Sequence, residues 1–123
     1  MKGFQDFTDL DVYKLSEQLC DTIWEIVLKW HSLAQDTVGK QIVRAADSIG
    51  ANIAEGHGSG TSPENRRFVR FAKRSLNESR HWLRRCQKRK LLAKGQETEL
   101  HDIMNQLRPK LIRYLASIGR KVS

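Results

Sequence analysis

The chain has 123 residues, with 22 Lys and Arg against 14 Asp and Glu and a formal net charge of +8. This length predicts a single domain, residues 1–123, that buries its own core, and a hydrophobic fraction of 39% excludes a disordered chain. No stretch reaches the roughly 18 uncharged residues of a membrane span, and the amino terminus has no apolar secretion segment, so we expect a cytoplasmic protein with no membrane partner.

The first half of the chain predicts two amphipathic helices. Apolar residues recur at steps of three and four over about 9–30, with Thr8 or Asp9 as the N-cap, and again over about 37–54. Three glycines within 56–60 end the second helix, because glycine sacrifices too much backbone entropy to remain helical. No stretch of more than a few residues shows the strict alternation of apolar and polar residues that is typical of a strand.

The third helix begins in the Thr-Ser-Pro-Glu stretch that follows the glycines. Either Ser62 is its N-cap, or Thr61 and Glu64 form a capping box. The helical pattern continues to about Lys90. Its apolar arc predicts a core-facing side made of Phe68, Phe71, Ala72, Ser75, Leu76, Ser79, Trp82, Leu83 and Cys86.

A fourth helix follows a predicted break at 94–96 and carries apolar residues as far as Ile118. Pro109 falls inside this pattern, where it predicts a kink and no fifth element. Four amphipathic helices joined by short connections predict an all-α protein, an antiparallel up-down four-helix bundle.

The positive charge is concentrated in one segment. Residues 63–95 hold twelve basic and two acidic side chains, a net charge of +10, whereas the rest of the chain has a net charge of −2. The outward side of the third helix gathers nine cations and no carboxylate, namely Arg66, Arg67, Arg70, Lys73, Arg74, Arg80, Arg84, Arg85 and Lys88. Like charges one turn apart repel, so this face predicts an anionic partner.

Nucleic acid is the anion that this face fits best. Seven of the nine cations are arginines, whose planar guanidinium groups pair with phosphate oxygens. No aromatic residue interrupts the face, so we expect binding to the backbone of RNA or DNA with little sequence preference and strong weakening by salt. The alternatives are an ordinary solvated helix face and a docking surface for an acidic protein or a polymerase.

Catalysis, metal binding and a cofactor are not expected. Arg74 and His81 match the Arg-x6-His spacing of all-helical ribonucleases, the weaker alternative for function, and we assign no catalytic residue. Cys20 and Cys86 lie far apart with no metal-ligand spacing and are predicted to be core residues. The glycine-rich loop before the third helix lacks the lysine and the preceding strand of a nucleotide loop.

The second helix carries a polar line beside its apolar stripe. The line consists of Gln41, Arg44, Ser48, Asn52 and Glu55. We expect these side chains to pair with neighbouring helices or subunits and to fix their register.

Three blocks of sequence resemble a known family. They are residues 7–13, residues 44–56 (RAADSIGANIAEG) and residues 75–78 (SLNE). The chain resembles the four-helix-bundle proteins encoded in intervening sequences of bacterial large-subunit (23S) ribosomal RNA genes, and it is similar to the accessory variability proteins of diversity-generating retroelements. The resemblance implies a four-helix bundle assembled as a homopentamer, with nucleic acid and a reverse transcriptase as partners.

Overall fold

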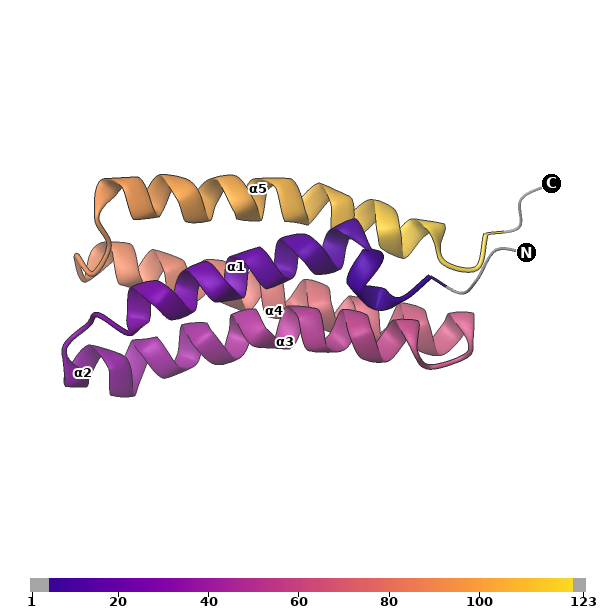
Figure 1. Cartoon of the computed structure of the whole chain (residues 1–123), viewed down its shortest axis with the longest axis horizontal. Coiled ribbons are helices and arrows are strands. Elements are labelled where there is room, and N and C mark those ends of the chain that lie inside the picture. Colours follow the sequence, from indigo (N-terminus) through magenta and orange to yellow (C-terminus); the bar gives the residue numbers. More distant parts are fainter. Residues whose placement is uncertain (1–4, 121–123) are drawn as a thin grey trace.

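The computed structural model describes residues 5–120, which form an antiparallel four-helix bundle (Figure 1). The long helices are α1 (Asp11–Val27), α3 (Lys40–His57), α4 (Ser62–Lys88) and α5 (Lys94–Ser117). Helices α1 and α4 each pack against both α3 and α5, so α1 and α4 lie across the bundle from each other. The predicted fold class and architecture are confirmed.

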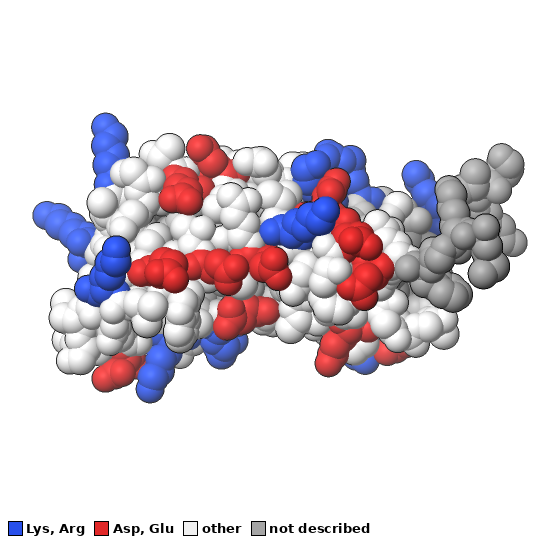
Figure 2. All heavy atoms as spheres, viewed as in Figure 1, with Lys and Arg blue, Asp and Glu red and all other residues white. Residues whose placement is uncertain are grey.

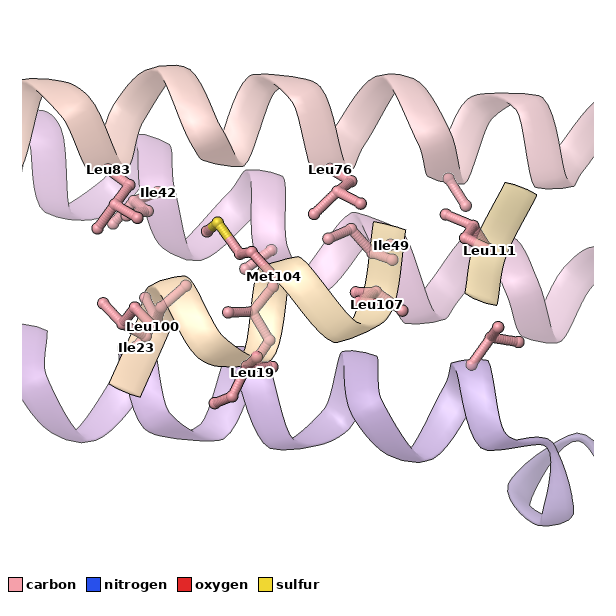
Figure 3. Packing of buried hydrophobic residues seen from close by; sticks show 14 of the residues in the cluster. Leu19, Ile23, Ile42, Ile49, Leu76, Leu83, Leu100, Met104, Leu107 and Leu111 are labelled. Carbon is pink, nitrogen blue, oxygen red and sulfur yellow. The ribbon is translucent and has the colours of Figure 1, made fainter. Parts of the chain in front are cut away.

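The core of the bundle is formed by one apolar stripe from each long helix (Figure 3). Leucine and isoleucine side chains dominate it, and the spacing of three and four residues places them on one side of each helix. The central residues are Leu19, Ile23, Ile42, Ile49, Leu76, Leu83, Leu100, Met104, Leu107 and Leu111.

The chain enters α1 through a 3₁₀ turn, Phe7–Asp9, that the sequence analysis did not predict. The carboxylate of Asp6 accepts the backbone N–H of Thr8 at 3.2 Å and caps this turn. The N-cap position of α1 is Leu10, which provides no side-chain cap, so the prediction of Thr8 or Asp9 was wrong.

The helical path before α3 begins earlier than predicted, at α2 (Ser32–Ala34), and continues through a π-helical turn, Gln35–Gly39. Its start is held by a side-chain cap and by hydrogen bonds to the end of α1. The His31 ring accepts the backbone N–H of Ala34 at 3.4 Å, and the Gln35 amide donates to the carbonyls of Val27 and Leu28 at 3.0 Å each. Such contacts between segments leave no periodic signal in the sequence.

Helix α3 continues through Gly56 to His57 and has Gly58 as its C-cap, so the prediction that the glycines within 56–60 end it is confirmed, although the last helical residue lies three positions beyond the predicted 54. A side chain at Gly56 would meet the Oδ1 atom of Asn65 at 2.6 Å and the Cβ atom of Phe68 at 2.9 Å. Glycine is therefore required by the close approach of α3 to the start of α4, and its entropic cost is offset by packing.

Both ends of α4 are defined by local hydrogen bonds. Thr61 is the N-cap, because its Oγ1 atom accepts the backbone N–H of Glu64 at 3.3 Å. Ser62 is the first helical residue, so the prediction of Ser62 as the N-cap was wrong. At the other end Lys90 adopts φ 57° and Leu91 donates its backbone N–H to Cys86 at 3.0 Å. This Schellman motif ends α4 at Lys88.

Helix α5 begins where the sequence predicted a break. The Gln96 side chain accepts the backbone N–H of Ala93 at 2.9 Å, which stabilises the first turn in place of the expected loop. The helix then passes Pro109 as one element, so the prediction of no fifth element is confirmed.

Candidate nucleic-acid interface

The buried side of α4 is rotated from the predicted one. Val69, which was not predicted to face the core, is fully buried together with Ala72, Leu76, Ser79, Leu83 and Cys86. Phe68, Phe71, Ser75 and Trp82, which were predicted to face the core, are only partly buried. Ser75 faces α3, where its hydroxyl donates to the Ser48 hydroxyl at 2.9 Å. Small side chains on α3 bring the two helices close, so large rings are displaced to the edge of the core.

The predicted cations are accessible on α4. Seven are exposed, namely Arg67, Arg70, Lys73, Arg74, Arg80, Arg84 and Lys88, and two, Arg66 and Arg85, are partly buried. The sequence therefore identified a surface and not a set of internal ion pairs.

Two of the nine cations have partners within the chain. Arg67 pairs with the Glu64 carboxylate at 3.1 Å, and Arg66 donates to the carbonyl of Ile118 at 3.1 Å, which ties α4 to the end of α5. Among these nine, the exposed cations that form no salt bridge with a described residue are Arg70, Lys73, Arg74, Arg80, Arg84 and Lys88. We call these six the free cations of α4; with Arg66 at the start, the face extends over about 33 Å of helix at 1.5 Å per residue.

Aromatic rings position two of the arginines. The Arg67 guanidinium lies 5.1 Å from the ring centre of Phe68 and 5.3 Å from that of Phe71, and the Arg74 guanidinium lies 5.8 Å from Phe71. These cation–π contacts restrict the side-chain rotamers of both arginines. The N–H groups of Arg67 are engaged by Glu64, whereas Arg74 forms no salt bridge with a described residue. The spacing of three and four residues between Phe71 and the two arginines is the signal that the sequence analysis missed.

The basic surface extends from α4 onto α5. Arg108 and Ile112 of α5 join Lys73, Asn77 and Arg80 of α4 around a groove of about 170 Å³. The sequence analysis did not include Arg108, because only the packing of α5 against α4 brings it there.

The opposite side of the bundle is acidic. Glu17, Asp21 and Glu25 recur at every fourth residue of α1 and are exposed, and Figure 2 shows a row of acidic side chains along α1. Because α1 lies across the bundle from α4, the cation-rich face of α4 and the acidic row of α1 lie on opposite sides of the bundle.

The polar line of α3 faces α4. Arg44 forms an ion pair with Glu78 of α4 and donates to the Gln41 amide oxygen at 3.1 Å. Asn52 donates to the backbone carbonyl and hydroxyl oxygens of Ser48 at 2.8 and 3.0 Å.

Two of the five side chains in the polar line therefore bond directly to α4, Arg44 and Ser48. Glu55 is exposed. The pairing of this line with other subunits stays a prediction.

Hydrogen bonding lowers the pKa of Glu78. The Trp82 indole N–H donates to the carboxylate at 3.0 Å and is the main cause, and Arg44 adds a second donor and a positive charge. Glu78 is therefore an anion whose ion pair with Arg44 links α4 to α3.

The arginine and histidine of the Arg-x6-His spacing, Arg74 and His81, are both exposed on α4. His81 lies edge-on to the Trp82 ring at 4.7 Å, and Ser75, which follows Arg74, faces α3. Burial raises the pKa of the Cys20 thiol to about 12 and that of Cys86 to about 11, so both are protonated at neutral pH. Cys86 is fully buried as predicted, whereas Cys20 is only partly buried.

Comparison with known protein families identifies the chain. The model of the 23S rRNA-intervening sequence proteins matches residues 8–113. The chain belongs to this family. The resemblance found in the sequence is thereby confirmed for the ribosomal RNA gene family.

A solved structure supports the fold of this 23S rRNA-intervening sequence protein. It is a protein of unknown function from the S23 ribosomal protein family of Bacteroides thetaiotaomicron, with 20% sequence identity and a TM-score of 0.75. The match covers 86% of this chain and 99% of that chain. No curated protein matches this sequence. Among the described helices, none is long and apolar enough to cross a membrane.

Proposed function

We propose that this 23S rRNA-intervening sequence protein is a non-enzymatic, homo-oligomeric protein that binds the backbone of RNA or DNA through α4. The observation that carries this proposal is the set of six free cations on one exposed helix face, opposite an acidic α1. The family name ties its members to ribosomal RNA genes, which supports nucleic acid as the anion.

The charge pattern of α4 favours a phosphate partner. Arg70, Arg74, Arg80, Arg84 and Lys88 include like charges one helical turn apart, which repel each other in the unbound protein. A phosphate backbone removes this repulsion and releases the counterions condensed on the nucleic acid. The gain is electrostatic and falls as the salt concentration rises.

Exposed apolar side chains support self-association. Trp24 is 51% exposed, Leu28 52% and Leu33 69%, and all three lie in the segment from α1 to α2. A second copy covering this segment would bury them. Several α4 faces in one assembly would then contact one nucleic acid and increase its avidity. A reverse transcriptase is the further partner that the resemblance implies, and nucleic acid held on α4 would be available to it.

A salt titration tests the proposed function. The protein is titrated onto a fluorescent duplex of unrelated sequence at several salt concentrations between about 50 and 200 mM, the range over which backbone binding weakens steeply. We expect the logarithm of the affinity to fall linearly with the logarithm of the salt concentration. Binding that is absent at low salt, or that hardly changes across the series, would refute backbone recognition by α4.

A further inference from the structure

The groove between α4 and α5 combines charge with an apolar floor. Lys73, Asn77 and Arg80 come from α4, and Arg108 comes from α5. Leu76, which is 3% exposed, and Ile112 complete the lining, and no lining residue is acidic. The groove of about 170 Å³ is smaller than the 300 to 1,000 Å³, roughly, of pockets for drug-sized ligands.

Ile112 is the feature that backbone binding leaves unexplained. Its side chain is 45% exposed, and the other large exposed apolar residues of the described chain lie in the segment 24–33. A phosphate gains nothing from an isoleucine side chain, whereas the face of a nucleobase gains from apolar contact. Asn77 adds an amide whose donor and acceptor groups suit the edge of a base.

The cations flank this apolar surface at a spacing that suits the two phosphates of one nucleotide. Lys73 and Arg80 are seven residues apart on α4, which is about 10 Å along the helix at 1.5 Å per residue. Arg108 lies on the other side of the groove, one turn before Ile112 on α5. A nucleotide within a strand has a phosphate on each side, so the cations can hold both phosphates while the base lies between them.

We propose that this groove holds one unpaired nucleobase on Ile112 and Leu76, and that the protein therefore binds single-stranded nucleic acid in preference to duplex. The inference rests on the proposed function and adds the class of nucleic acid to it. Bases in a duplex are paired and stacked and cannot enter the groove, whereas those of a single strand can turn outward. The free cations on the outward side of α4 still bind duplex through its backbone.

The test compares single-stranded and duplex RNA of the same length and composition by fluorescence anisotropy at one salt concentration. The variant Ile112→Ser removes the apolar surface without changing the charge. We expect it to weaken single-strand binding about tenfold, near the lower end of the range for losing one base stacked on an aromatic ring, and to change duplex binding less than twofold. Gln106→Ser is the control on the same helix, since Gln106 is exposed on α5 and does not line the groove, and it should change neither affinity.

Three outcomes separate this inference from the proposed function. If Ile112→Ser weakens both RNAs equally or neither of them, the groove holds no base, while backbone binding stands. If Ile112→Ser, unlike Gln106→Ser, changes the subunit number measured by light scattering, the groove is a contact between copies and the inference is overturned. If the unmodified protein binds neither RNA, the proposed function itself fails.

Discussion

Neutralising two arginines on α4 should weaken nucleic-acid binding and at the same time stabilise the fold. Arg70 has basic neighbours four residues away on both sides, Arg66 and Arg74, and Arg84 likewise lies between Arg80 and Lys88. The double variant Arg70→Gln/Arg84→Gln therefore removes four repulsive pairs. At about 0.2–0.5 kcal/mol per pair before screening by salt, the free energy of unfolding should rise by about 1 kcal/mol.

The binding effect of the same variant has the opposite sign. If all six free cations contact phosphates, the slope of log affinity against log salt is about −5 on duplex DNA, and losing two contacts reduces it to about −4. Between 50 and 200 mM salt the unmodified protein should lose about a thousandfold in affinity and the variant about a hundredfold. The melting temperature of the variant should rise by about 4 °C.

Thermal unfolding and a salt series of anisotropy titrations measure the two effects on the same samples. Lys29→Gln/Arg113→Gln is the matched control, because it removes two exposed cations that lie outside α4. This control should keep the full salt slope. An unchanged slope in the α4 variant, or an equal loss of slope in the control, would refute the assignment of the interface, and a fall in melting temperature would refute the repulsion argument.

Three further predictions concern the fold that carries this surface. Gly56→Ala should lower the free energy of unfolding by about 2 kcal/mol, because its Cβ atom would lie 2.6 Å from a side-chain oxygen of α4; a variant as stable as the unmodified protein in urea would contradict this packing. The pKa values of Cys20 and Cys86 are raised to about 12 and about 11. Both thiols should therefore react far more slowly with iodoacetamide at pH 8 in the folded protein than in urea. Rapid labelling of the folded protein, measured by mass spectrometry, would argue against their burial. Glu78→Gln should cost less than about 1 kcal/mol at pH 7, since its ion pair with Arg44 is exposed. The lowered pKa of Glu78 means that this contribution is present above the ordinary Glu value of about 4.3 and is lost as the pH falls through the lowered value, so a difference in melting temperature that grows as the pH falls below about 4.3 would be inconsistent with it.

The fold was predictable from the sequence because each long helix repeats its apolar residues at helical spacing. Helix ends were predictable only where the signal is local. Thr61 was one of two N-cap candidates identified from neighbouring residues, whereas the start of α2 depends on the Gln35 amide reaching back to the end of α1. The left-handed backbone of Lys90 at the end of α4 could not be predicted either, because glycine is the residue that usually signals such a position.

The candidate interface was predictable in part. The cations of α4 could be grouped on one face because they belong to one helix. The rotation of that helix depends on packing, so Val69 was not assigned to the core and Phe71 was placed there, although the structure places Phe71 beside Arg67 and Arg74. The residues of α5 that line the groove could not be predicted, because the sequence does not show which helix lies next to α4.

Mapping the contact with bound nucleic acid tests the central claim most directly. RNA carrying a photoreactive uridine analogue is cross-linked to the protein, and the modified peptides are identified by mass spectrometry. The account predicts that cross-links fall on α4 between residues 66 and 88 and on the neighbouring part of α5 around Arg108. Cross-links concentrated on the acidic α1, or on the apolar segment 24–33, would contradict it.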